Sequence, residues 1–139
     1  MAPVRKIRRN PKRIWKPILS TITLLASADK LADVGPLLVR ITDALGTNAA
    51  ARLLGADRAQ VSRWGAGTEL IGAEMGRRIV DLHDVLTRIL RAYNRDAAAR
   101  WLVGSEPLLG GARPIDVLAS EGAAPVIRAI DGIMQGAYA

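Results

Sequence analysis

The sequence predicts an all-α protein, and its composition and its hydrophobic spacing both support that fold class. Hydrophobic residues make up 50% of the chain, Phe is absent, and Ala, Leu and Ile dominate. This composition suits helices that pack closely through small side chains. Apolar residues also recur at helical spacing in several segments. At 139 residues the chain can form one core, or two small helical units that share one.

The positive charge of the chain is concentrated in residues 1–16, which we expect to be a basic, flexible arm. The net charge is +7, and this segment holds no acidic residue but many basic ones: Arg5, Lys6, Arg8, Arg9, Lys12, Arg13 and Lys16. All 13 acidic residues follow it, and there the remaining basic residues equal them in number. Such a segment cannot bury enough apolar surface to fold alone, and it attracts polyanions. It therefore contacts DNA phosphates or serves as a solubilising tail.

The apolar run after the arm fits two interpretations. Its apolar residues have the spacing of an amphipathic helix: Ile18, Leu19, Ile22, Leu25 and Ala26. A basic region, an apolar run and the small residues 26–28 also resemble a secretory signal with its cleavage site. Because Ser and Thr residues interrupt the run, we favour the helix and a cytoplasmic protein. No segment approaches the roughly 20 apolar residues of a membrane span, so no membrane partner is expected.

The segment Thr47–Gly67 predicts a helix-turn-helix. Gly55 tolerates the positive φ on which a first helix can end, and Asp57 can cap the second helix. Small or apolar residues occupy the positions inside the corner: Ala50, Ala51, Leu54, Ala56, Val61 and Trp64. The outward side of the second helix then carries the candidate DNA-binding residues: Arg58, Gln60, Ser62 and Arg63. The alternative is a pair of ordinary bundle helices with a solvated polar face.

Helices are also predicted on both sides of this unit. Gly35-Pro36 interrupts the preceding helix and starts a new one over 36–45, which Gly46 ends. Thr47 or Asn48 can cap the helix after it. The longest periodic segment runs from about Glu69 to Tyr93, with a heptad-like seam: Met75, Ile79, Leu82, Leu86, Ile89 and Tyr93. This seam packs either in a core within the chain or against a second copy of the chain in a two-fold dimer.

The opposite face of that long segment should be solvated, because opposite charges lie four residues apart: Glu74/Arg78, Arg77/Asp81 and Asp84/Arg88. His83 is the only His, with no Cys or second His beside it, so we expect a structural or exposed residue. We assign residues 17–93 to one helix-turn-helix domain that binds DNA and dimerises.

Residues 94–139 predict a second, smaller helical domain. Asn94 begins a helix that Gly104 ends, a loop spans 105–112, and Pro114 begins a short helix through Leu118. The last helix, from about 124 to 135, has one apolar stripe: Val126, Ile127, Ile130, Ile133 and Met134. Residues 136–139 form a short uncharged tail.

Several short motifs in residues 94–138 resemble the toxin-binding domain of the Xre/MbcA/ParS antitoxins, the partners of RES-domain toxins. The motifs occur in the family's order: Trp101-Leu102, Leu109-Gly110-Gly111, Arg113-Pro114-Ile115-Asp116-Val117-Leu118 and Glu121-Gly122-Ala123. The preceding helix-turn-helix matches the family's Xre-like half. The resemblance therefore covers the whole chain except the basic arm, and it implies the all-α, two-domain fold given above.

The resemblance implies a function. In this family the antitoxin binds a toxin that consumes NAD or transfers its ADP-ribose, the C-terminal segment approaches the NAD pocket, and the complex represses its own operon. The implied toxin-binding residues are Trp101, Leu102, Leu109, Arg113, Pro114, Asp116, Glu121, Gly122, Val126, Gly136, Ala137 and Tyr138. Residues 136–138 are the implied plug. Trp101 and Leu118 are expected in the core, whereas the guanidinium of Arg113 suits contact with carboxylates or phosphates.

The leading hypothesis is a cytoplasmic type II antitoxin that binds a RES-domain toxin and operator DNA, as a homodimer and in higher-order complexes. We expect no enzyme, because catalytic residues, metal ligands and cofactor motifs are lacking in the sequence. The alternative is a stand-alone helix-turn-helix regulator whose C-terminal helices dimerise or sense a ligand. A third possibility is an architectural nucleic-acid binder that depends on its arm.

Overall fold

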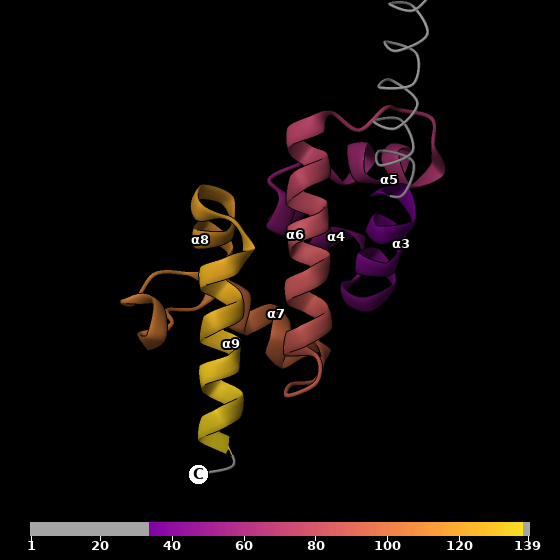
Figure 1. Ribbon diagram of the computed structural model, residues 1–139. Coiled ribbons are helices and arrows are strands. Elements are labelled where there is room, and N and C mark those ends of the chain that lie inside the picture. Colours follow the sequence, from indigo (N-terminus) through magenta and orange to yellow (C-terminus); the bar gives the residue numbers. More distant parts are fainter. Residues whose placement is uncertain (1–33, 138–139) are drawn as a thin grey trace, which may run out of the picture. The chain divides into compact units, whose positions relative to one another are not determined.

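The computed structural model describes residues 34–137, and every regular element within them is a helix. The all-α prediction is therefore confirmed for this part of the chain (Figure 1). The described residues 34–137 belong to one compact unit. The expected basic arm, the amphipathic helix after it and Tyr138 lie outside the described residues.

The first described helix is α3 (Val34–Leu45). Gly35 and Pro36 were expected to separate two helices, but both lie within α3. Gly46 ends the helix with a φ of 87°, as expected.

The next two helices, α4 (Thr47–Leu54) and α5 (Arg58–Ala66), meet at the predicted corner. Gly55 ends α4 in the left-handed conformation, with a φ of 66°. Of the side chains expected inside the corner, Ala56 is half-buried. The others are buried: Ala50, Ala51, Leu54, Val61 and Trp64. Small side chains here let the two helices approach each other closely.

The side-chain caps predicted for these two helices are wrong. Asp57 stands at the N-cap position of α5, but its side chain accepts no hydrogen bond from the helix. Only Gly46 separates α3 from α4, so Thr47 and Asn48 already belong to the helix and cannot cap it. The sharp backbone turn at Gly46 replaces a capping residue.

The long periodic segment forms α6 (Ala73–Ile89), which is shorter than the helix predicted from Glu69 to Tyr93. Gly67, with a φ of 76°, turns the chain away from α5 before α6 begins after Gly72. At the other end, the N–H of Tyr93 still bonds the carbonyl of Ile89, but the chain is already in a turn. The predicted ion pairs all form on the solvated face: Arg78–Glu74, Arg77–Asp81 and Arg88–Asp84.

The C-terminal part contains α7 (Arg95–Val103), the 3-10 helix η1 (Pro107–Leu109), α8 (Pro114–Glu121) and α9 (Ala123–Ala137). The side chain of Asn94 caps α7 by accepting from the N–H of Ala97 at 2.9 Å, which agrees with the predicted start. The helix α8 runs one turn beyond the predicted end at Leu118. The expected tail is also wrong in part, because Gly136 and Ala137 belong to α9.

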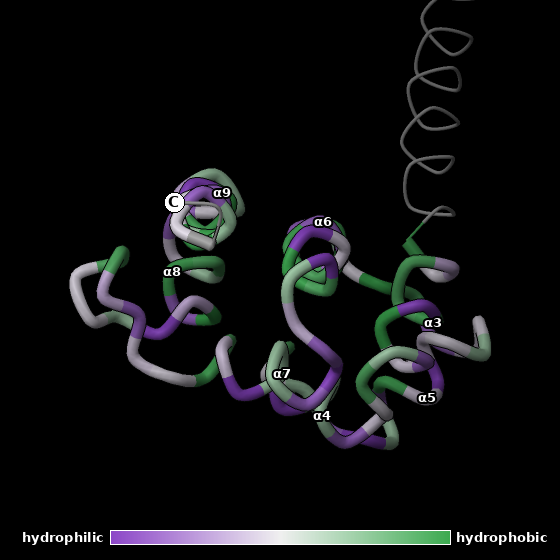
Figure 2. Tube along the Cα trace, turned by 90° about the horizontal axis from the view of Figure 1, so that it is seen from below, coloured by the Kyte–Doolittle hydropathy of each residue, from purple (hydrophilic) through white to green (hydrophobic). Residues whose placement is uncertain are grey.

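The core is centred on α6, which packs against α3 on one side and α9 on the other (Figures 1 and 2). The predicted seam of α6 is buried at Ile79, Leu82, Leu86 and Ile89, and it therefore contributes to the core of the chain itself. Val85 is also fully buried, because α6 needs a wider apolar face to contact neighbours on two sides. Among the helices of the described residues, none combines the length and the apolar composition of a membrane span.

Candidate functional site

The residues predicted to bind DNA lie on α5, and most of them face solvent. Arg58, Ser62 and Arg63 are exposed, whereas Gln60 is half-buried. The buried face of the same helix holds Val61 and Trp64 in the core. Their position on one short helix leaves the exposed side chains free to reach a partner without rearrangement of the core.

Arg63 is partly committed to a neighbour within the chain. Its Nε donates to Oε1 of Glu69 at 3.2 Å, while the side chain remains 51% exposed. Thr68 closes the same turn, because its backbone N–H and its hydroxyl both donate to the carbonyl of Arg63. The ion pair therefore holds the segment after α5 against the end of that helix, and it orients the guanidinium of Arg63.

A shallow hollow of about 440 Å³ lies between α4 and α5. It is lined by Asn48, Ala51, Arg52, Ala56, Asp57 and Arg58. Arg52 was not among the predicted site residues, although it lies on α4 and shares this hollow with Arg58. Its exposed position at the end of a helix that leads into the corner was the signal in the sequence that could have identified it.

The structure separates the predicted toxin-binding residues by their exposure. The buried members are Leu102, Pro114 and Val126. The half-buried members are Trp101, Leu109 and Gly122. The exposed members are Arg113, Asp116, Glu121 and Gly136. Ala137 is the last residue of α9, and Tyr138 lies outside the described residues. The exposed members are the most accessible to a partner, and the buried ones hold the helices that present them.

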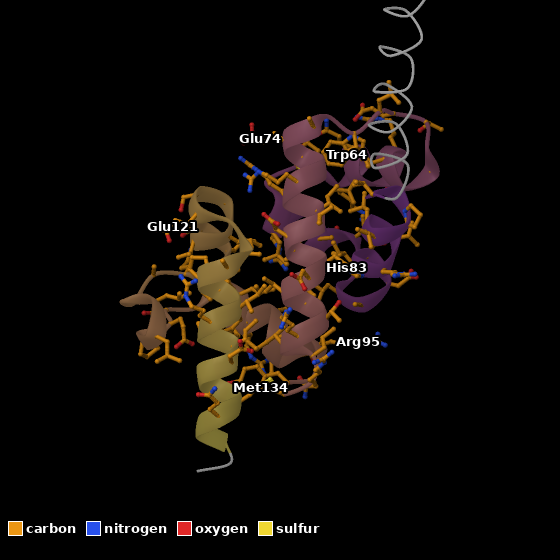
Figure 3. The ribbon with its side chains drawn as sticks, viewed as in Figure 1. Trp64, Glu74, His83, Arg95, Glu121 and Met134 are labelled. Atoms are coloured by element: carbon orange, nitrogen blue, oxygen red, sulfur yellow. The ribbon has the colours of Figure 1, made fainter. Side chains whose placement is uncertain are left out.

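The helices that carry most of the exposed toxin-binding and DNA-binding candidates lie on opposite sides of α6. In both views α8 and α9 lie on one side of this helix, and α3 and α5 lie on the other (Figures 1 and 2). Figure 3 shows the same separation for Glu121 on α8 and Trp64 on α5. The structure therefore does not combine the two predicted sets into one site.

Glu106 organises the loop between α7 and α8, and the sequence analysis missed it. Its side chain is only 7% exposed. One carboxylate oxygen accepts from Nε1 of Trp101 at 2.7 Å, and the other accepts from the N–H of Leu108 at 3.0 Å. Its backbone N–H donates to Ala112 at 3.1 Å, and its carbonyl accepts from Gly111 at 2.9 Å. The Glu directly before Pro107, at the N-cap of η1, was the signal in the sequence.

Close packing of η1 against α9 depends on a Gly. A Cβ at Gly132 would lie 3.0 Å from Cδ1 of Leu108, so a larger residue would displace that side chain. Leu108 itself remains 58% exposed. The loop that carries the predicted Leu109-Gly110-Gly111 motif is thus anchored on one side by Glu106 and on the other by α9.

Arg113 and Asp116 form a bidentate ion pair at the start of α8. Nε of Arg113 donates to Oδ2 of Asp116 at 2.7 Å, and Nη2 donates to Oδ1 at 2.9 Å. The hydrogen bond from Arg113 lowers the pKa of Asp116, and the hydrogen bond to Asp116 raises the pKa of Arg113. Two of the predicted contact residues therefore satisfy each other until a partner competes for the guanidinium.

His83 lies on α6 beside α3 and belongs to neither predicted surface (Figure 3). It lines a hollow of about 150 Å³ together with Arg40, Ile41, Ala44, Leu86, Thr87 and Leu90. Burial lowers the pKa of its imidazole, and the positive charge of Arg40 lowers that pKa further. The side chain therefore favours the neutral form, with a partly apolar environment.

The described residues contain no group of three His, Asp or Glu side chains that could hold a metal ion. The acidic side chains of α6 are instead paired with arginines one turn away. Comparisons with protein-family models, with curated proteins and with solved structures found no match.

Proposed function

We propose that this protein is a type II antitoxin that neutralises a RES-domain toxin by direct binding and represses its own operon by binding operator DNA. The separation of the two exposed residue sets by α6 supports this proposal more than any other observation (Figure 2). A chain that presents two surfaces on different helices can hold a protein and a duplex at the same time. Autorepression by a toxin–antitoxin complex requires that arrangement.

The corner formed by α4 and α5 supports the DNA-binding part of the proposal. Its closely packed interior holds α5 rigidly, and Arg58, Ser62 and Arg63 are exposed on that helix. A helix of this kind can enter the major groove, where Arg recognises guanine and Ser reaches bases or phosphates. A homodimer that presents two copies of α5 is expected to recognise two half-sites on one face of the duplex.

The arrangement of α8 and α9 supports the toxin-binding part. Asp116 and Glu121 are exposed on α8, Arg113 is exposed at its N-cap position, and Gly136 is exposed near the end of α9. The last turn of α9 contains small residues and no charged ones, so it can enter a concave pocket that would reject bulky charged side chains. In this proposal the C-terminal end blocks access of NAD to the toxin, which requires no chemistry from the inhibitor.

The decisive experiment is co-expression with the product of the adjacent open reading frame, which we expect to be a RES-domain toxin. The chain should relieve the growth arrest caused by that toxin, co-purify with it and retard a duplex from the operon's promoter. Deletion of residues 136–139 should weaken protection while folding and DNA binding persist. A chain that neither binds that product nor relieves the arrest, yet still binds the promoter, would instead be a stand-alone regulator.

Substitutions on α5 test the separation of the two activities. Arg58→Ala and Arg63→Ala are each expected to cost about 1–3 kcal/mol of operator binding and to leave toxin neutralisation intact. Arg91→Ala is the matched control, because Arg91 is exposed in the turn after α6 and far along the chain from α5. Loss of both activities in the α5 variants would contradict two separate surfaces. Electrophoretic mobility shift and growth assays measure the two outcomes.

A further inference from the structure

A second hollow lies between α4, α7 and α8, and it shares Arg113 with the proposed toxin-binding surface. Its volume is about 410 Å³, which falls within the range of ligand-binding pockets. It is lined by Ala49, Arg52, Leu53, Ala99, Arg100, Val103, Arg113 and Ile115. Three separate helices therefore contribute apolar side chains to it, and the arginines come from α4, from α7 and from the N-cap position of α8.

The arginines of this hollow leave positive charge available. Arg52 and Arg100 are exposed, and within residues 34–137 neither forms an ion pair. Arg113 is held by Asp116, so it neutralises one carboxylate within the chain. The lining therefore keeps an excess of two positive charges, and no acidic side chain contributes to it.

The apolar part of the lining is also unusually accessible. Val103 is 46% exposed although it is a large hydrophobic residue at the end of α7. It lies in the same hollow as Leu53 and Ile115, which come from α4 and α8. An apolar group that covered Val103 would gain hydrophobic stabilisation, and carboxylates on either side of that group would meet the arginines.

We propose that this hollow is a docking site for an acidic segment of another protein, in which one apolar side chain enters the hollow and flanking carboxylates bind Arg52 and Arg100. Guanidinium groups bind carboxylates with paired hydrogen bonds, so they fix the orientation of such a segment. The apolar side chain supplies the hydrophobic part of the affinity. The inference goes beyond the proposed function, because it requires neither a RES-domain toxin nor an operator, and Arg113 is the lining residue that the two proposals share.

Charge complementarity selects this occupant over two others. The chain's own residues 1–16 contain many basic residues and no acidic one, so they would be repelled by the arginines. A duplex offers phosphates to arginines, but its backbone has no apolar side chain that would enter a recess lined by Leu53, Val103 and Ile115. An acidic segment with an apolar anchor satisfies both components of the lining.

The test uses the full chain and a phage-displayed library of random short peptides. Selection should enrich peptides in which Asp or Glu residues flank a Leu, Phe or Trp. Synthetic versions should bind the chain, and the double variant Arg52→Glu/Arg100→Glu should weaken their binding roughly tenfold or more. Arg91→Glu, an exposed charge reversal outside the hollow, should leave binding unchanged.

Val103→Ser is a second variant that removes apolar contact without changing charge. Because Val103 is 46% exposed, this substitution should preserve folding and weaken peptide binding several-fold. Circular dichroism of each variant verifies the fold. Three results would overturn the inference: no enriched peptide, peptides without acidic residues, or peptide binding that both variants leave intact. Weakened binding of mixed-sequence duplex by the double variant, without peptide binding, would assign the arginines to DNA.

Discussion

The α4–α5 corner and the loop between α7 and α8 both reverse the chain, but they are stabilised in different ways. The corner has an apolar interior that includes Trp64, which is 6% exposed. Within the described residues the Nε1 of this Trp has no hydrogen-bond partner. The loop instead is organised around the buried carboxylate of Glu106, which accepts from Nε1 of Trp101 at 2.7 Å.

This difference shows what each Trp contributes. Trp64 stabilises the corner by the volume and apolar surface that it buries, so its ring matters more than its polar atom. Trp101 is half-buried and contributes a hydrogen bond that keeps a buried carboxylate satisfied. An apolar core tolerates a different side chain if its volume is similar. A buried carboxylate is destabilised when it loses a hydrogen-bond partner.

Removal of the Trp64 ring should have the largest effect. Trp64→Ala leaves a cavity in the core and should lower the free energy of unfolding by about 3–5 kcal/mol. Urea denaturation followed by far-ultraviolet circular dichroism measures this change. A loss below about 1 kcal/mol would contradict the view that the corner depends on packing.

The two Trp→Phe substitutions should separate packing from hydrogen bonding. Trp101→Phe removes a partner of the buried carboxylate of Glu106 and should cost about 1–3 kcal/mol beyond any change in packing. Trp64→Phe removes no hydrogen bond within the described residues, and it should cost less than Trp64→Ala. Comparison of each variant with its Ala counterpart, in the same urea experiment, isolates the contribution of Nε1. The stability lost in Trp→Phe can be expressed as a fraction of the stability lost in Trp→Ala. If that fraction were the same at positions 64 and 101, the distinction between the two regions would disappear.

The smallest effect is expected at the exposed pair beside the loop. The hydrogen bond from Arg113 lowers the pKa of Asp116, so this carboxyl stabilises the fold above its unfolded pKa and loses that contribution as pH falls through its folded pKa. Titration of the carboxyl carbon by NMR should give a midpoint below the ordinary Asp value, and Arg113→Ala should move it upward. Arg128→Ala is the control, because Arg128 is exposed on α9. An unchanged midpoint in Arg113→Ala would contradict the pair.

Much of the helical framework could be predicted because its signals are local. The left-handed Gly55, the buried positions of the corner and the ion pairs of α6 all follow from spacing within one or two helices. The cap at Asn94 follows from a residue type at a helix start. These features depend on neighbours within a turn or two, so the order of residues is sufficient to indicate them.

Helix ends were less predictable because backbone geometry competes with side-chain preference. Thr47 and Asp57 are good capping residues, but Gly46 and the tight corner leave them without capping bonds. The seam expected to continue to Tyr93 is cut short when the chain turns after Leu90. Periodicity indicates which residues are apolar on one face, and it does not indicate where a turn ends the helix.

By itself the sequence determined the all-helical nature of residues 34–137, the residues inside the corner and the charged face of α6, since each depends on contacts within a segment. Only the tertiary structure decided that Glu106 is buried, that Leu102 and Val126 lie in the core, and that Arg52 shares a hollow with Arg100 and Arg113. The physical reason is that burial and charge clustering depend on which segments meet. Residues that are far apart in the chain acquire a common environment only when the helices pack.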